Sequence, residues 1–148
     1  MKIQVKRLVP EARLPFRGHP TDAGADVHAV SVNVIQSREG EFKAAVYGTG
    51  LAFVLPRGYF MDFRARSSVW KTGQILANGV GTIDEDYHDE VKAVFQVLSG
   101  GRLYDVGDRI GQLVIHPYVS PADIEFVEVE ELEYESDRGG GFGSTGKA

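Results

Sequence analysis

One segment of the sequence combines glycines, an apolar pair and several carboxylates at a spacing that suits chemistry on a small ligand. It runs Asn78-Gly-Val-Gly-Thr-Ile83-Asp84-Glu-Asp86-Tyr87-His88-Asp89-Glu90. Its glycines permit a tight hairpin and a close approach of the backbone to a flat ligand. A carboxylate beside a reacting phosphate, here Asp84, can take a proton from an attacking water, an effect worth about 10² to 10⁴ in rate. Taken alone, the segment fits an ordinary surface turn equally well. A calcium loop does not fit, because the required glycine and glutamate are missing at the sixth and twelfth positions.

A second segment, Arg64-Ala-Arg66-Ser67-Ser68-Val-Trp70-Lys71, is suited to anions. Two hydroxyls and backbone N–H groups at a helix start can bind an anion, and a guanidinium strengthens the site. The alternative is a serine helix cap flanked by solvated arginines. We expect a single short helix over residues 67–74, with Gly73 near its end, and we expect Trp70 to lie in the core.

The glycine-rich C-terminal tail contains a third pattern. Residues 141–147 satisfy G-x-x-x-x-G-K, but Ala148 stands where a phosphate-binding loop of the NTPase type needs Ser or Thr for magnesium. What remains is a flap whose Arg138, Ser144, Thr145 and Lys147 could contact phosphates and whose Phe142 could stack on a ring. A disordered tail is the alternative. We predict a domain over residues 1–137 and a flexible flap over residues 138–148, because so many glycines oppose a fixed conformation.

Two further segments are weak by themselves. They are Asp22-Ala-Gly-Ala-Asp26-Val27 and Gly107-Asp108-Arg109-Ile110-Gly111-Gln112, and each also fits a bend or loop that leads into a strand. The four histidines, at positions 19, 28, 88 and 116, lack metal-ligand spacing, and the sequence has no cysteine. We therefore expect no zinc site and no disulfide.

The composition limits the classes of protein. The 148 residues are 43% hydrophobic, which suits one domain with its own core. The formal net charge is −5, and the charges are interspersed, so no basic stripe predicts a nucleic-acid partner. The apolar run in MKIQVKRLV is too short for a signal peptide, and no stretch has the length of a membrane span. We expect a soluble, cytoplasmic protein without a membrane partner.

The elements that must position these segments are strands. Apolar residues alternate with polar ones at Val30, Val32 and Val34, and again at Val91, Ala93, Phe95 and Val97, and Leu113 and Ile115 continue the pattern. Residues 51–55 and 59–65 flank Pro56-Arg57-Gly58, which predicts a hairpin in register. The acidic stretch 123–137 is typical of a solvated strand or edge. The fold class is therefore all-β, with at most one short helix.

Taken together and in this order, the five segments resemble the five motifs of the trimeric dUTP diphosphatases over about residues 21–146. Asp26 matches the first motif, and Arg66 with Ser67 matches the second. Residues 78–87 match the third motif, and Arg109 with Gln112 matches the fourth. Arg138 with the run Phe142-Gly-Ser-Thr-Gly matches the fifth.

The resemblance implies a role for each segment. Residues 78–83, including Asn78, Gly81 and Ile83, would read the uracil edge through backbone groups. Tyr87 would lie against the deoxyribose and leave no room for a 2′-hydroxyl, and Asp84 would hold the water in line with the α-phosphorus. The expected phosphate contacts are Arg66, Ser67, Ser68, Arg109 and Gln112. From the tail, Phe142 would stack on uracil while Arg138, Gly143, Ser144 and Thr145 close over the triphosphate.

The resemblance also implies an assembly and a cofactor. Family members are distorted jelly-roll (β-clip type) homotrimers, in which each site takes motifs from three subunits and the fifth motif arrives from a neighbour. Mg²⁺ would sit on the substrate phosphates without direct protein ligands, in keeping with its tendency to retain waters. Asp26 would have a supporting electrostatic role, through a magnesium-bound water. The implied reaction is hydrolysis of dUTP to dUMP and pyrophosphate, which removes dUTP and supplies dUMP for thymidylate synthesis.

The sequence departs from the family pattern in three places. The family usually has a glycine two positions after the tyrosine of the third motif. Here Tyr87 is followed by His88 and Asp89, so Asp89 takes the place of that glycine. The stretch from Arg138 to Phe142 is one residue shorter than the commonest form. Ser68-Val-Trp70-Lys71 replaces the glycine-bearing second motif and is similar to the sister family of dCTP deaminases.

Two other functions compete with this interpretation. A dCTP deaminase needs a glutamate on the strand after the third motif, where this sequence has Val94, and a valine cannot carry a proton. A non-catalytic regulator of the same fold would not need the full set of expected catalytic residues that this sequence retains. The sequence therefore favours the diphosphatase.

Overall fold

A computed structural model of the protein describes residues 1–36 and 43–133. Within these ranges the chain forms ten strands and two single-turn 3₁₀ helices. The strands are β1 (Gln4–Arg7), β2 (Gly24–His28), β3 (Ser31–Gln36), β4 (Lys43–Gly48), β5 (Leu51–Val54), β6 (Tyr59–Ala65), β7 (Gln74–Leu76), β8 (Gly81–Ile83), β9 (Lys92–Val97) and β10 (Arg109–Pro117). The 3₁₀ helices are η1 (Val69–Thr72) and η2 (Pro121–Asp123).

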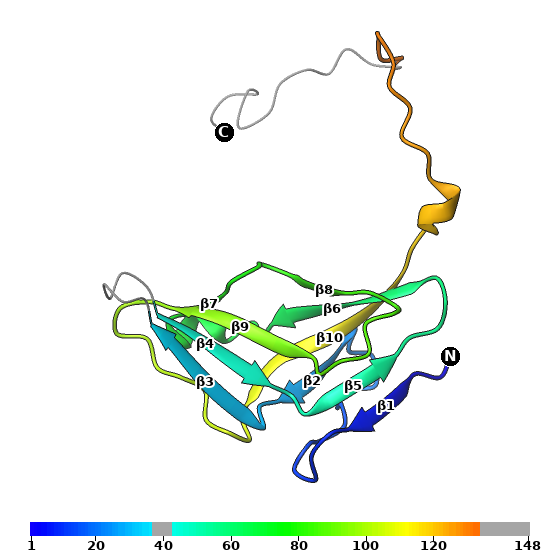
Figure 1. Cartoon of the computed structure of the whole chain (residues 1–148). Coiled ribbons are helices and arrows are strands. Elements are labelled where there is room, and N and C mark those ends of the chain that lie inside the picture. The colour runs from blue at the N-terminus through cyan, green and yellow to red at the C-terminus, as the bar shows by residue number, and fades with distance from the viewer. Residues whose placement is uncertain (37–42, 134–148) are drawn as a thin grey trace.

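The strands form three antiparallel sheets. Two have four strands each, in the orders β2-β10-β6-β8 and β3-β4-β9-β7, and the third pairs β1 with β5. The two larger sheets face each other (Figure 1), and their inner side chains share one apolar core. The predicted all-β, distorted jelly-roll fold is confirmed. In the described ranges, no helix has the length and apolarity to cross a membrane.

Phe95 lies at the centre of this core and shows why β9 forms where it was predicted. Along β9 buried and exposed residues alternate, with Ala93, Phe95 and Val97 inside. The Phe95 ring makes edge-on contacts with Tyr47, Phe63 and Tyr104, at centroid distances of 5.7, 6.4 and 6.0 Å. Such aromatic pairs add stability beyond the area they bury. Phe63 belongs to the opposite sheet, so this cluster joins the two layers.

The prediction for β3 was wrong about burial. Val32 and Val34 were expected to face the core, but they are 38% and 42% exposed. The strand itself forms, and it pairs with β4 in the register that places Val32 opposite Tyr47. β3 is an edge strand of its sheet, so only one neighbour shields its side chains.

The predicted hairpin over residues 51–65 is also wrong in its pairing. The turn exists, because Gly58 has φ +82° and the Tyr59 N–H donates to the Pro56 carbonyl at 3.2 Å. However, β5 pairs with β1, while β6 pairs with β10 and β8. The turn therefore carries the chain from one sheet to another. The expected tight turn at Gly79 (φ +69°) likewise connects β7 and β8, which belong to different sheets.

The expected helix is a 3₁₀ turn, η1, and it ends as predicted at Gly73, whose φ is +66°. The Ser68 side chain makes no capping hydrogen bond. Trp70 is 73% exposed instead of lying in the core, and Thr72 is the buried residue of the turn. A single 3₁₀ turn packs only one of its sides against the core, and here the side chain on that side is Thr72.

Beyond β10 the chain leaves the sheets. The Tyr118 N–H still donates to the Gly58 carbonyl, and residues 118–123, which include the unpredicted turn η2, line a depression together with the 56–58 turn. The chain beyond η2 extends away from the body (Figure 1). Between 124 and 133 the structure has no strand, although a solvated strand or edge was expected. The side chains of this segment are exposed, and Phe126 is 96% accessible. We refer to residues 118–133 as the arm.

The aromatic centre of the core gives a first prediction. Phe95→Ala should lower the free energy of unfolding by about 3–5 kcal/mol, because it leaves a cavity where three aromatic rings meet. Val94→Ala, on the opposite face of the same strand, should cost less than about 1 kcal/mol. Urea unfolding at one fixed chain concentration measures both, since assembly would couple stability to concentration. Equal losses in the two variants would contradict the central role of Phe95.

Candidate functional site

Three predicted site residues from distant parts of the chain meet at one end of the β2-β10-β6 arrangement. Asp26 lies on β2, Arg66 follows β6, and Arg109 begins β10. The Arg109 guanidinium donates to the Asp26 carboxylate at 2.9 Å, and Arg66 Nε lies 3.8 Å from the other carboxylate oxygen. They meet because β10 pairs with β2 on one side and with β6 on the other. We call these residues the Asp26 cluster.

Gln112 extends this cluster across the sheet. It stands opposite Asp26 on β2 and opposite Arg64 on β6, so its side chain shares their face. Its amide lies over Gly24, where a Cβ would overlap it. The absence of a side chain at Gly24 therefore lets Gln112 lie beside Asp26.

His28 lies near the same cluster without adding charge to it. Burial, followed by the charges of Arg13 and Arg109, lowers the pKa of His28, and Asp26 only partly opposes them. A lowered pKa keeps the imidazole neutral at pH 7. Its Nδ1 is buried without a hydrogen-bond partner among the described residues.

A basic depression adjoins the Asp26 cluster. Four cationic side chains and one carboxylate lie around it, so it attracts anions. Its lining residues are Arg66, Ser68, Lys71, Thr72, Arg102, Tyr104, Asp108 and Arg109. Ser67 is exposed at the bend between β6 and η1. Sequence reasoning gave no role to Lys71 or Arg102, since Arg102 lies in the loop before β10 and no motif marks it.

The third-motif residues lie in a separate pocket around β8. Phe63 and Val91 supply apolar walls, and Gly81 keeps the backbone accessible, because a Cβ there would press on Asn78 and Phe63. The lining residues are Phe63, Asn78, Gly81, Thr82, Ile83, Asp84, Tyr87, Val91 and Lys92. All five residues predicted here on the third motif, Asn78, Gly81, Ile83, Asp84 and Tyr87, line this pocket. We call it the β8 pocket.

A tight turn fixes the spacing of Asp84 and Tyr87. The Tyr87 N–H donates to the Asp84 carbonyl at 3.2 Å, and the Tyr87 hydroxyl donates to the Glu90 carbonyl at 3.0 Å. The ring is 43% exposed at the pocket edge. Tyr87 can therefore contact a ligand while its hydroxyl is held by the chain.

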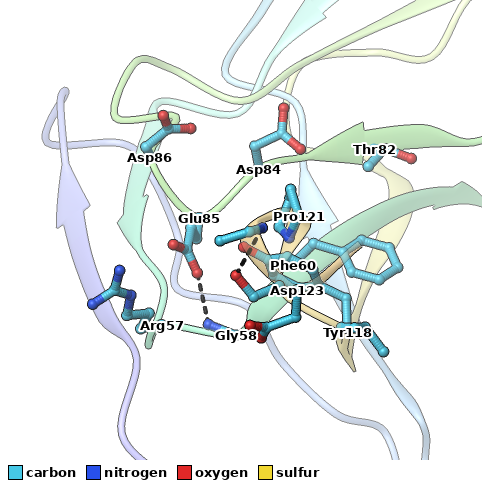
Figure 2. Close-up of a pocket in the computed structure, with 13 residues that line it drawn as sticks. Arg57, Gly58, Phe60, Thr82, Asp84, Glu85, Asp86, Tyr118, Pro121 and Asp123 are labelled. Atoms are coloured by element: carbon cyan, nitrogen blue, oxygen red, sulfur yellow. Dashed lines mark hydrogen bonds between the residues drawn. The ribbon is translucent and has the colours of Figure 1, made fainter. Parts of the chain in front are cut away.

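Asp84 also borders a wider depression, which lies between the end of β8, the 56–58 turn and residues 118–123 and is shown in Figure 2. Glu85 turns toward the 56–58 turn and accepts a hydrogen bond from the Gly58 N–H at 2.7 Å. The Asp84 and Asp86 side chains point away from that turn (Figure 2). In the described ranges, the Asp84 carboxylate has no hydrogen bond or ion pair with another side chain, so it is free to bind a water.

The predicted residues thus form two groups within one chain. The basic depression and the β8 pocket have no lining residue in common. The fifth-motif residues Arg138, Phe142, Gly143, Ser144 and Thr145 lie outside the described residues. Across the described ranges, no group of three or more His, Asp or Glu side chains could hold a metal ion.

Sequence comparisons find the same family along nearly the whole chain. The family model described as dUTPase matches residues 10–146. A deoxyuridine 5′-triphosphate nucleotidohydrolase from Hydrogenobaculum sp. is 38% identical over 148 residues, covering 99% of each chain. The protein of the same name from Nautilia profundicola is 40% identical over 151 residues, covering 99% of this chain and 100% of its own.

Solved structures agree. A variant of the dUTPase of Staphylococcus bacteriophage 80alpha, determined with dUpNHpp, has a TM-score of 0.77 at 30% identity and covers 98% of both chains. A variant of the phage phi11 dUTPase of S. aureus, whose structure is described as revealing the coordination of a structural Mg(II) ion, has a TM-score of 0.71 at 27% identity. It matches 90% of this chain and 100% of its own. The matched length, the identities and the shared architecture together show that this chain belongs to the dUTPase family.

Proposed function

We propose that the chain hydrolyses dUTP to dUMP and pyrophosphate, by attack of water at the α-phosphorus, and so removes dUTP and supplies dUMP for thymidylate synthesis. The observation that carries the proposal is the placement of the family motifs. Asp84, whose carboxylate pairs with no side chain of the described residues, lines the β8 pocket together with the rest of the third motif. The second and fourth motifs line a basic depression.

Asp84 holds and activates the water. Its carboxylate is exposed and unengaged by other side chains, so a water can bind it and lose a proton to it as the oxygen attacks. The dUTP pyrimidine and sugar occupy the β8 pocket, with uracil on the backbone of residues 78–83. Tyr87 closes the sugar end of that pocket and leaves no space for a 2′-hydroxyl.

The triphosphate occupies the basic depression. Arg66, Ser67, Ser68, Arg109 and Gln112 supply its contacts. Asp26 is assigned a supporting role, which its ion pairs support: its carboxylate lies 3.8 Å from Arg66 and 2.9 Å from Arg109 and so can orient both guanidinium groups. A fixed guanidinium loses less entropy when it binds a phosphate.

Mg²⁺ is proposed as the cofactor, bound to the substrate phosphates with few protein ligands. The residues present fit this arrangement, because the Asp26 carboxylate already pairs with Arg66 and Arg109, two of the proposed phosphate contacts. A contact from Asp26 to the ion would pass through water, as the strong hydration of Mg²⁺ allows. The ion would neutralise charge on the phosphates while the chain's own residues orient them.

A homotrimer with shared sites accounts for the separation of the two groups. Within one chain the β8 pocket and the basic depression are distinct, so a second copy would bring the pocket of one subunit to the depression of another. The exposed apolar side chains of the arm also need a partner surface. The predicted flap, residues 138–148, then comes from a neighbour, with residues 1–137 as the domain. A cytoplasmic location is proposed with it.

The reaction class has a direct test. Purified protein is incubated in the presence of Mg²⁺ with one nucleotide at a time: dUTP, dCTP or UTP. The products of each reaction are then separated. Pyrophosphate and dUMP from dUTP alone are expected. Ammonia release from dCTP would instead support a deaminase, which the outward-facing Val94 of β9 argues against.

Asp84 generates the second prediction. Asp84→Asn should lower kcat by two or more orders of magnitude while dUTP still binds, because the amide keeps the shape and loses the base. Stopped-flow turnover and equilibrium binding of a non-hydrolysable dUTP analogue measure the two effects. Turnover near the wild-type rate would remove Asp84 from the catalytic role.

Tyr87 generates the third prediction. Tyr87→Ala should admit UTP, because the space for a 2′-hydroxyl opens when the ring is removed. The measurement is the ratio of kcat/KM for dUTP to that for UTP. If this ratio stayed at its wild-type value, Tyr87 would not be the group that excludes ribose.

The shared site generates the fourth prediction. Inactive Asp84→Asn chains and inactive chains truncated before Arg138 are unfolded together and reassembled. If one subunit's Asp84 works with another's flap, some mixed trimers contain an intact pair and activity returns. A flap that served its own subunit's Asp84 would leave one defect in every site.

Two controls accompany the mixing experiment. Size-exclusion chromatography with light scattering must show that the truncated chain is still a trimer. Each variant unfolded and reassembled alone must remain inactive. With both controls met, a dead mixture contradicts the shared site.

A further inference from the structure

Glu90 ends the loop that follows the third motif. Its main-chain carbonyl and its side-chain carboxylate bind two different parts of the chain. Its carbonyl accepts the hydrogen bond from the Tyr87 hydroxyl at 3.0 Å. Its carboxylate accepts a hydrogen bond from the Gly50 N–H at 2.8 Å, forty residues earlier in the chain. The same carboxylate lies 3.3 Å from Lys92 Nζ. Glu90 therefore connects Tyr87 to the corner between β4 and β5.

That corner, residues 48–50, is a rigid anchor. Thr49 is buried, and its hydroxyl donates to the Val91 carbonyl at 2.7 Å while accepting from the Leu51 N–H at 3.2 Å. The Thr49 N–H also donates to the Val91 carbonyl, and the Val91 N–H donates to the Leu51 carbonyl. These bonds fix the Glu90–Val91 main chain against the corner, so the Gly50 N–H lies at a set distance from Glu90 and its carboxylate can accept from that N–H.

Gly48 leaves the space that the carboxylate occupies. A Cβ at Gly48 would lie 2.5 Å from Glu90 Oε1 and equally close to Ser31 Oγ, a distance that real Cβ atoms do not show. Gly48 has no positive φ among the backbone values of the described residues. The requirement for glycine here is therefore the close approach of two side chains, those of Glu90 and Ser31, and a methyl group at this position would push the Glu90 carboxylate away from the Gly50 N–H as well as displace the Ser31 hydroxyl.

Tyr87 depends on this connection more than a core tyrosine would. Its ring is largely uncovered on one side, and its hydroxyl makes one hydrogen bond among the described residues, to the Glu90 carbonyl. A ring that must exclude a single hydroxyl has to be held to within a fraction of an ångström. We propose that Glu90 is a positioning residue for sugar selection, which it sets by fixing Tyr87 against the β4–β5 corner. This inference rests on the proposed hydrolysis of dUTP and on Tyr87 as the residue that contacts the sugar.

The test compares dUTP with UTP in three variants of the full-length chain. Glu90→Ala removes the carboxylate. Gly48→Ala keeps both Glu90 and the Gly50 N–H but displaces the Glu90 carboxylate. Both should lower the dUTP to UTP ratio of kcat/KM by about tenfold, chiefly through a lower KM for UTP, with kcat for dUTP within about threefold of wild type. Glu90→Gln is the matched control, because its amide oxygen can still accept from the Gly50 N–H. Its ratio should stay within about threefold of wild type.

A double variant separates positioning from general loosening. If Glu90 acts through the Tyr87 hydroxyl, adding Glu90→Ala to Tyr87→Phe should change the ratio little beyond Tyr87→Phe alone. Thermal unfolding of each variant is recorded in parallel. A lower Tm with an unchanged ratio in both Glu90→Ala and Gly48→Ala would show a merely structural role and overturn the proposal. A Gln variant as impaired as the Ala variant would exclude the Gly50 hydrogen bond as the anchor.

The activity of the wild-type protein distinguishes a failure of the proposed hydrolysis from a failure of the proposed role of Glu90. If the wild-type protein fails to hydrolyse dUTP, the proposed function itself is wrong. If it hydrolyses dUTP and UTP equally, sugar selection by Tyr87 and by Glu90 is wrong while the hydrolase remains. If it selects dUTP and neither Glu90→Ala nor Gly48→Ala alters the selection, only the role of Glu90 is wrong.

Discussion

The pairing of β10 with two strands at once is the constraint on which the Asp26 cluster depends. β2 and β6 are far apart in sequence, and each reaches the cluster only because β10 lies between them. The hydrogen bonds of β10 thereby set the positions of three charged side chains, Asp26, Arg66 and Arg109, to within the reach of an ion pair. A single slip of register along β10 would turn Gln112 to the opposite face of the sheet, away from all three.

Sequence reasoning succeeded where the signal is local. Alternation along residues 93–97 identified a half-buried strand, and glycines marked the turns at Gly58, Gly73 and Gly79. It failed on strand partners, since Pro56-Arg57-Gly58 specifies a turn but not which sheet receives the next strand. It also misplaced Trp70, because hydrophobicity does not reveal that a single 3₁₀ turn has only one buried position, taken here by Thr72.

The candidate site shows the same division. Motif order predicted the candidate residues, but the contacts around them could not be read from the sequence. The Asp26 ion pairs, the Gln112 amide over Gly24 and the Glu90 carboxylate over Gly48 all join residues whose separation along the chain obeys no short pattern. Gly24 and Gly48 look like ordinary strand glycines until the side chain that fills their space is known.

The arm has a consequence for the newly synthesised chain. Ile124, Phe126, Val129 and Leu132 are exposed on a segment without its own sheet, which is the kind of surface that nucleates aggregation in a newly made polypeptide. Glutamates stand beside or between these residues along the same stretch. Two such segments laid side by side would bring like charges together, so self-stacking is opposed until a surface with different charges is met. The acidic residues thus act as gatekeepers, which protect the chain during synthesis while leaving the apolar side chains available.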